Sequence, residues 1–139
     1  MTTDEPAQWL ILGRYHVLGE LGRGAMGIVY KVHDDRLDRV IALKTIRKDV
    51  FVVSDEPEQE VLERFRREGR AAGKLSPPGI VTIYDISEEG DDLYIAMEFV
   101  DGEPLGERMR ATPRMPVAEA ARIGTRICEA LEYAHAHGV

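Results

Sequence analysis

Three glycines near the start of the chain have the spacing G-x-G-x-x-G, in the segment G-R-G-A-M-G at residues 22–27. Gly22, Gly24 and Gly27 carry no side chain, so the backbone between them can approach the phosphates of a nucleotide closely. Several kinds of nucleotide-binding protein share this spacing, and an ordinary glycine-rich hairpin can have it too. The residues that follow must decide between these alternatives.

A lysine that could reach phosphate oxygens lies seventeen residues after the last of these glycines, in the segment I-A-L-K at residues 41–44. Residues two apart in a strand share a face, so Ala42 and Lys44 are expected to point the same way. The apolar Ile41 and Leu43 then point to the other face. The first face combines a small side chain, which leaves room for a flat base, with a cation. The alternative is that Lys44 is an ordinary solvated lysine.

A carboxylate lies on the apolar side of a helix that the pattern predicts at residues 57–75. The stripe given by three- and four-residue spacing consists of Val61, Phe65, Glu68, Ala72 and Leu75. Because burying an unpaired carboxylate is costly, Glu68 is expected to have a cationic partner. One source of that partner is the charged run of the same helix, made of Arg64, Arg66, Arg67 and Arg70.

Five strands and one helix must position these residues in the first hundred positions. The expected strands are residues 15–22, 27–34, 38–46, 80–86 and 92–99, and the helix is residues 57–75. Short polar turns between the strands predict an α+β fold with a five-stranded antiparallel sheet. Because β-branched Ile28 and Val29 follow Gly27, a dinucleotide-binding fold is excluded, since its last glycine opens a helix.

The last forty residues have a different character. Proline and glycine recur between residues 100 and 116, where a short helix is possible, and a longer helix is predicted at residues 117–137. Its apolar face consists of Val117, Ala120, Gly124, Ile127, Leu131 and Ala134. That face needs a partner.

The order of glycine loop, strand lysine, helix glutamate and final strand resembles the Hanks-type serine/threonine protein kinases of bacteria. The segments G-R-G-A-M-G at 22–27 and R-F-R-R-E at 64–68 carry the resemblance most specifically, and it covers residues 13–139. It implies ATP as ligand and Lys44 as the partner of Glu68. Because Gly69 and Gly73 weaken the helix of Glu68, this helix is also expected to be able to swing outward without nucleotide or second lobe, which would separate Glu68 from Lys44. The resemblance also implies a base pocket with apolar walls, a gatekeeper and a hinge whose backbone carbonyl and amide bind adenine. These residues are Leu21, Val29 and Ala42 for the walls, Met97 for the gatekeeper, and Glu98 and Val100 for the carbonyl and the amide.

The same resemblance divides the chain into a lead-in at residues 1–12, an ATP-binding lobe at 13–100, and a hinge with the first helices of a second lobe at 101–139. Kinases continue into the motifs H-R-D, D-F-G and A-P-E, none of which occurs here. The missing aspartates include the Mg²⁺ ligand and the base that acts on the hydroxyl of a protein substrate. These 139 residues alone are therefore expected to be inactive.

The alternative function is a non-catalytic, kinase-like interaction module. In either case the uncovered face of the last helix predicts a homodimer through residues 117–139, with residues 103–112 as a possible addition. The intact glycines, Lys44 and Glu68 favour the nucleotide-binding function, because a scaffold has no physical need of them.

Composition excludes several other classes. With 18 Lys and Arg against 25 Asp and Glu, the net charge of −7 argues against nucleic-acid binding, which needs clustered cations. The single cysteine, Cys128, can form no internal disulfide, and no metal site is expected. The sequence has neither a signal peptide nor an apolar stretch of membrane-spanning length, so a cytoplasmic location is expected.

Overall fold

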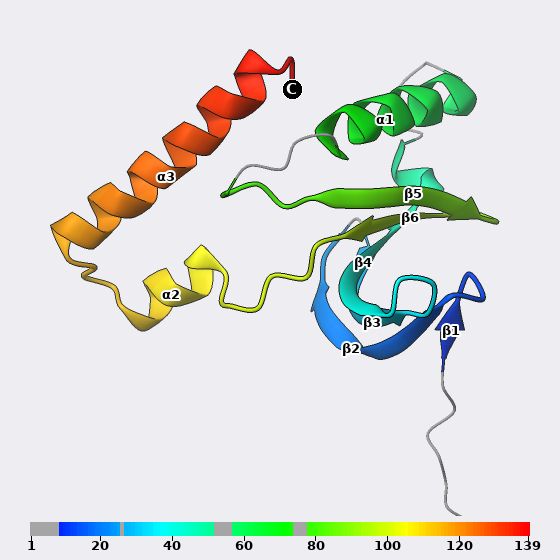
Figure 1. Cartoon of the computed structure of the whole chain (residues 1–139), viewed down its shortest axis with the longest axis horizontal. Coiled ribbons are helices and arrows are strands. Elements are labelled where there is room, and N and C mark those ends of the chain that lie inside the picture. The colour runs from blue at the N-terminus through cyan, green and yellow to red at the C-terminus, as the bar shows by residue number, and fades with distance from the viewer. Residues whose placement is uncertain (1–8, 26, 52–56, 74–77) are drawn as a thin grey trace, which may run out of the picture.

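The protein is described by a computed structural model at residues 9–25, 27–51, 57–73 and 78–139, and its central element is a curled antiparallel sheet (Figure 1). Six strands pair in the order β1-β2-β3-β4-β6-β5. Their bounds are Leu10–Ile11 (β1), Tyr15–Arg23 (β2), Gly27–Asp34 (β3), Arg39–Arg47 (β4), Ile83–Glu89 (β5) and Asp92–Met97 (β6). The 3-10 helix η1 spans Lys48–Phe51, and the helices α1, α2 and α3 span Glu58–Gly73, Leu105–Ala111 and Val117–Ala136.

The α+β class and five of the strands are confirmed, but the prediction of a five-stranded sheet is wrong by one strand. The additional strand, β1, has two residues, and Leu10 and Ile11 pair with His16 and Tyr15 of β2. A tight turn between them returns the chain, with Leu12 at a φ of 55° and Gly13 at 59°. Two residues are too few to show alternation, and a leucine in the left-handed region is not expected from sequence.

The curled strands enclose an apolar core on one face of the sheet. The buried members are Ile11, Tyr15, Tyr30, Val32, Ile41, Leu43 and Ala96. Ile41 and Leu43 point into it, as the alternation of β4 predicts. This core fixes the register of β3 against β4, because a slip of one residue would turn every apolar side chain to the opposite face.

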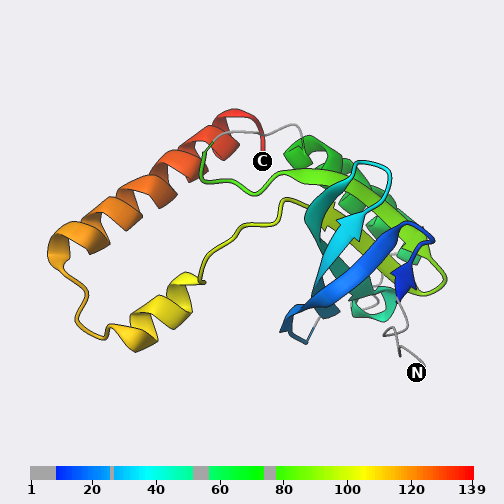
Figure 2. The ribbon, with the colours of Figure 1, turned by 60° about the horizontal axis from the view of Figure 1, so that its bottom comes forward.

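Helix α1 covers part of the other face of the sheet (Figure 2). Its Leu62 is buried together with Ile46, Leu93 and Ile95 from the strands, and Phe65 packs against them. Further along α1, two glycines allow a close approach to β5. A Cβ at Gly69 would lie 2.2 Å from Cδ1 of Ile86, and one at Gly73 would lie 3.0 Å from the carbonyl oxygen of Ile83.

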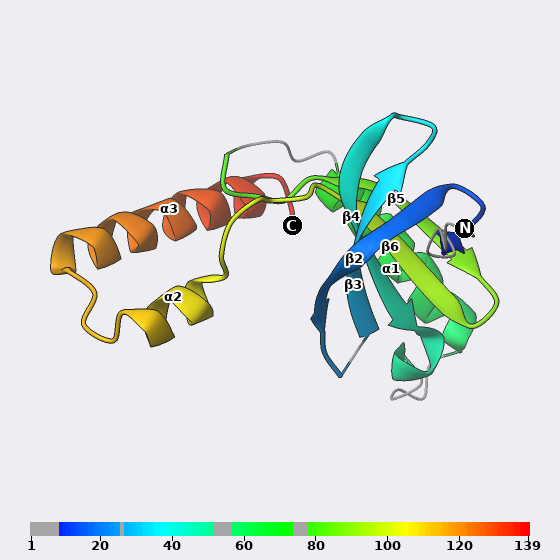
Figure 3. The ribbon, with the colours of Figure 1, turned by 90° about the horizontal axis from the view of Figure 1, so that it is seen from below.

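Helices α2 and α3 extend from the end of β6 and lie beside the sheet rather than over it (Figure 3). Both were predicted, and neither contains a buried residue. Helix α3 approaches the rest of the chain at the turn before β5, where a Cβ at Gly79 would lie 3.5 Å from Cβ of Ala130. No helix in the described ranges is long and apolar enough to cross a membrane.

Candidate functional site

The glycine loop joins β2 to β3, and no helix follows it, in agreement with the sequence analysis. The amide of Gly24 donates to the carbonyl of Gly27 at 2.9 Å, which closes the loop. A Cβ at Gly27 would lie only 1.7 Å from the carbonyl oxygen of Thr45. Glycine is therefore required at position 27 by the approach of two backbones, whereas Gly22 and Gly24 have open space around them.

The register of the three central strands places the predicted pocket residues on one face. Val29 of β3 lies opposite Lys44 of β4, and Lys44 lies opposite Ile95 of β6. In the next row, Ala42 lies between Lys31 and Met97. Because directly opposite residues share a face, Val29, Ala42, Lys44 and Met97 lie together on the face that α1 partly covers. Ala42 is buried and Lys44 is half-buried. This agrees with the expected face, in which a small side chain lies beneath the base and a cation lies beside it.

The hinge segment after β6 is held from two sides. The amide of Glu98 donates to the carbonyl of Thr82 at 2.8 Å, and the amide of Thr82 donates to Oε2 of Glu98 at 3.2 Å. On the other side, the ammonium of Lys31 lies 4.6 Å from the ring centre of Phe99. Within the described ranges, neither the carbonyl of Glu98 nor the amide of Val100 forms a hydrogen bond. Both groups are therefore available to a hydrogen-bond partner from outside the described residues.

Leu21 is the predicted wall residue whose placement the strand pattern determines least. It lies where the register between β2 and β3 shifts, between Glu20 and Gly22, and 47% of it is exposed. Next to it, Glu20 and Arg23 form a two-bond ion pair with distances of 3.0 and 2.9 Å. The hydrogen bond from Arg23 lowers the pKa of Glu20. Both residues belong to β2, the strand that leads into the loop, so this pair bridges the register shift within that strand.

Glu68 is not on the buried side of α1, where the apolar stripe predicts it, and its separation from Lys44 fits the expected outward swing of this helix. Its side chain is exposed, and it forms no ion pair with Lys44 or any other described residue. The sheet-facing side of α1 instead runs through Leu62, Gly69 and Gly73. Val61 and Phe65 of the predicted stripe lie on the buried side as expected, whereas Glu68 does not. Beyond Phe65 the closest contacts are made by glycines, which hydrophobicity does not mark. Of that stripe, Leu75 lies outside the described residues.

An ion-pair cluster holds α1 in this orientation. Arg66 pairs with Glu88 of β5, and Lys48 of η1 lies 3.5 Å from the same carboxylate. Lys48 also donates to the carbonyl of Gly90 at 2.7 Å. The hydrogen bond from Arg66 lowers the pKa of Glu88. Helix α1, the 3-10 helix η1 and the β5–β6 hairpin are thereby linked.

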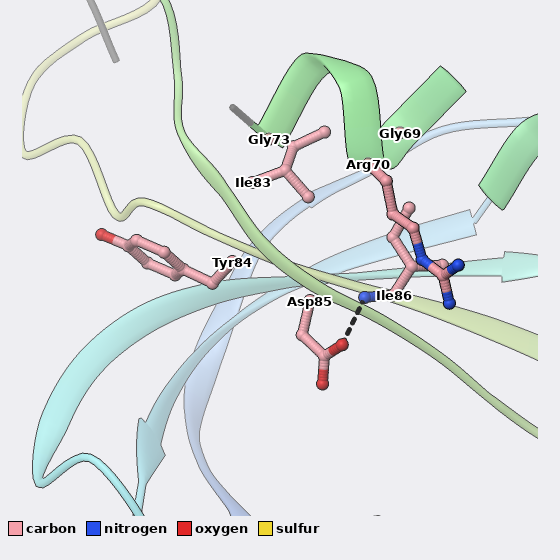
Figure 4. A pocket seen from close by; sticks show the side chains of 7 residues that line it. All are labelled: Gly69, Arg70, Gly73, Ile83, Tyr84, Asp85 and Ile86. Atoms are coloured by element: carbon pink, nitrogen blue, oxygen red, sulfur yellow. Dashed lines mark hydrogen bonds between the residues drawn. The ribbon is translucent and has the colours of Figure 1, made fainter. Parts of the chain in front are cut away.

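A groove between α1 and β5 is a separate feature (Figure 4). It has a volume of about 400 Å³ and is lined by Gly69, Arg70, Gly73, Ile83, Tyr84, Asp85 and Ile86. None of the predicted site residues is among them. The groove runs along the line where the glycines of α1 meet the strand, and its polar members, Arg70 and Asp85, form no bond with each other (Figure 4).

Sequence reasoning missed three residues around the site: Thr45, Thr82 and Lys31. Lys31 could have been found by continuing the alternation of β3 two positions beyond Val29. Thr45 acts through its hydroxyl on the backbone of Ile28, and Thr82 acts through its backbone on Glu98. A single sequence carries no signal for such contacts between distant residues. The described residues contain no group of three side chains that could hold a metal ion.

Comparison with known proteins identifies the fold. The family model "protein kinase domain" matches residues 15–139, and the chain belongs to this family. It is 41% identical over 125 residues to the serine/threonine-protein kinase PrkC of Bacillus subtilis, covering 90% of this chain and 18% of PrkC. A probable serine/threonine-protein kinase of Streptomyces coelicolor is 39% identical over 131 residues, with 91% and 19% coverage.

The crystal structure of the PknI kinase domain of Mycobacterium tuberculosis superimposes with a TM-score of 0.79 and 34% sequence identity. The match covers 96% of this chain and 52% of that one. The resemblance to bacterial Hanks-type kinases is thus confirmed. The chain spans about a fifth of the length of these two curated relatives and about half of the solved kinase domain.

Proposed function

We propose that this chain is the ATP-binding part of a serine/threonine protein kinase that phosphorylates protein hydroxyl groups. The observation that supports the proposal is the strand register, in which Val29 lies opposite Lys44 and Ala42 lies opposite Met97, so that the four residues share one face. Such a face offers a flat apolar floor at one end and a cation at the other. ATP has a matching arrangement, with its flat adenine at one end and its negatively charged phosphates at the other.

Each group has a defined task in this proposal. Leu21, Val29 and Ala42 contact the two faces of the base, and Met97 closes the back of its pocket. The carbonyl of Glu98 accepts a hydrogen bond from the base, and the amide of Val100 donates one. Lys44 binds phosphate oxygens, and the backbone at Gly22, Gly24 and Gly27 covers them. ATP supplies the phosphoryl group for transfer.

Glu68 is proposed to orient Lys44 only after α1 has turned. In the present arrangement Glu68 faces solvent, and the contacts of Gly69, Gly73 and Arg66 hold the helix. The described residues do not fit Mg²⁺, since they include no three-ligand cluster and the sequence contains no D-F-G motif. We therefore propose nucleotide binding, without phosphoryl transfer, for these 139 residues alone. A nucleotide-binding role is compatible with a cytoplasmic location.

Calorimetric titration with ATP and Mg²⁺ tests the proposal. We expect the wild-type chain to bind and Lys44→Met to lose most of its affinity, because the variant keeps the side-chain length and removes the cation. Arg47→Met is the matched control, since Arg47 is exposed and pairs with Asp49. Absence of binding by the wild type, or equal binding by Lys44→Met, would contradict the proposal.

A second candidate function, an association module, is favoured by α2 and α3. Their large apolar side chains are exposed, and Val117 is 85% accessible. Between the two helices lies a mostly apolar groove of about 330 Å³, whose lining includes Leu105, Met109, Ile123 and Ile127. We propose a homodimer through this surface as the alternative role. It would be unaffected by Lys44→Met, which separates the two functions.

A further inference from the structure

A hydroxyl group holds the base of the glycine loop. Oγ1 of Thr45 donates to the carbonyl of Ile28 at 3.1 Å and accepts from the amide of Ile28 at 3.2 Å. Both polar backbone groups of one residue thus meet a single side chain on the neighbouring strand. Ile28 is the first residue after the last glycine of the loop, and the contact is partly buried.

The adjoining residue makes the same junction tight. Gly27 approaches the backbone of Thr45 so closely that a Cβ would lie 1.7 Å from its carbonyl oxygen and 2.8 Å from its carbonyl carbon. Gly27 in turn accepts the hydrogen bond from Gly24 that closes the loop. Three successive contacts therefore connect the tip of the loop to β4 at residue 45.

The junction lies directly beside Lys44 along β4. Thr45 directly follows Lys44, and Ile28 directly precedes Val29, which lies opposite Lys44. The hydroxyl thus links the start of the strand that leaves the glycine loop to the residue next to Lys44. The floor residue Ala42 is three positions further along β4, about 10 Å away. The base end of the pocket is therefore remote from this contact.

We propose that Thr45 is a positioning residue, which holds the glycine loop at a set height over Lys44 and thereby determines affinity for the phosphates of ATP. The inference rests on the proposed function. Valine at position 45 has nearly the same shape but leaves the amide and carbonyl of Ile28 without this partner. Serine restores the hydroxyl and lacks only a methyl group.

The first test compares ATP with adenosine by titration calorimetry of the full chain. We expect Thr45→Val to bind ATP with Mg²⁺ about tenfold more weakly, while its affinity for adenosine stays within about twofold of wild type. Thr45→Ser should recover most of the ATP affinity. Thr125→Val is the matched control, because the hydroxyl of Thr125 donates to Ala121 on α3, away from the loop. Unchanged ATP affinity in Thr45→Val, or an equal loss for adenosine, would overturn the proposal.

The second test needs no ligand. Amide hydrogen exchange measured by NMR should be about tenfold faster at Ile28 in Thr45→Val than in the wild type, Thr45→Ser and Thr125→Val. If the wild-type chain bound neither ATP nor adenosine, the proposed function would fail, and exchange at residues 24–28 would still decide the role of Thr45. Exchange at those residues that does not differ between Thr45→Val and wild type would overturn the inference.

Discussion

At the scale of single residues, Asp34 is a charged side chain buried in the sheet, with 1% of it exposed. Arg14 donates to both of its carboxylate oxygens, at 2.8 and 2.7 Å, and the amide of Arg36 donates a third bond at 3.0 Å. The hydrogen bonds from Arg14 lower the pKa of Asp34. The pair joins the turn after β1 to the end of β3, and it keeps the curled edge of the sheet closed.

Asp34→Asn should lower the free energy of unfolding by about 2 kcal/mol, because the guanidinium of Arg14 loses its charged partner. Fully buried pairs cost about 3–5 kcal/mol when broken, but the side chain of Arg14 remains 17% exposed. Urea denaturation measures the change. Asp49→Asn, which breaks the exposed pair with Arg47, is the control and should cost less than about 1 kcal/mol. A loss in Asp34→Asn no larger than in this control would contradict the account.

The same pair predicts a pH dependence. The pKa of Asp34 is lower in the folded state than in the unfolded chain, so its contribution is complete above the ordinary carboxyl pKa of about 4. It is lost as the pH falls through the lowered value of the folded state. The stability difference between wild type and Asp34→Asn should therefore shrink as the pH falls below about 4. If this stability difference instead grew as the pH fell, the lowering of the Asp34 pKa in the folded state would be contradicted.

Which site residues could be predicted from sequence follows from their geometry. Lys44 and Ala42 were placed correctly because strand alternation leaves no freedom once the strand is recognised. Glu68 was placed on the wrong side of its helix because α1 is oriented by Gly69, Gly73 and the Arg66–Glu88 pair, all of which depend on β5. A helix has many possible orientations about its axis, and here contacts between distant segments choose one.

At the scale of elements, α1 packs closely on β5. The glycines bring the helix so close to the strand that a side chain at position 69 would meet the end of Ile86. In an isolated helix glycine costs about 1 kcal/mol relative to alanine. In this protein the close contact with β5 offsets that cost. From the sequence alone, Gly69 and Gly73 appear only as residues that weaken a helix.

A double-mutant cycle can separate these two effects. In the wild-type protein Gly69→Ala should stabilise less than the helix propensity of alanine alone would give, because Cδ1 of Ile86 lies 2.2 Å from the new Cβ and must move aside. In the Ile86→Ala background the obstacle is absent, and the same change should stabilise by up to about 1 kcal/mol. Thermal or urea unfolding of the four proteins gives the coupling. Equal effects of Gly69→Ala in both backgrounds would mean that α1 and β5 are not in this contact.

Among the strands, the sequence predicted the long members and missed the short one. Strands β2 to β6 show alternation or apolar runs bounded by turns, and these signals are local. Strand β1 exists because Leu12 and Gly13 adopt positive φ and bring two residues back onto β2. Such a turn is a consequence of tertiary packing, so composition alone gives no warning of it.

At the scale of the whole molecule, the sheet with α1 has its own buried core, whereas α2 and α3 have none. Arg108 links the two helices through Glu119, at 2.9 Å from its Nε, and also reaches Glu103 at 3.2 Å. Polar contacts of this kind set the angle between helices but bury little apolar surface. The exposed apolar side chains of α2 and α3 therefore remain available for association.

Ile127→Glu should weaken self-association if the chain dimerises through α3. Ile127 is 47% exposed and lines the groove between α2 and α3, so a charge there would be buried by any partner. Light scattering with size-exclusion chromatography measures the mass over a range of concentrations. Thr125→Glu introduces the same charge on another side of α3 and serves as the control. A wild-type chain that stays monomeric at high concentration would exclude this role.

The most direct test of the central claim is an NMR titration of the isotope-labelled chain with ATP and Mg²⁺. If ATP binds on the face that carries Val29, Ala42 and Lys44, the amide signals should shift at residues 21–31, 42–46 and 97–101. Signals of α3 should stay in place. Shifts confined to α3 or to the groove between α1 and β5, or no shifts at saturating nucleotide, would contradict the account.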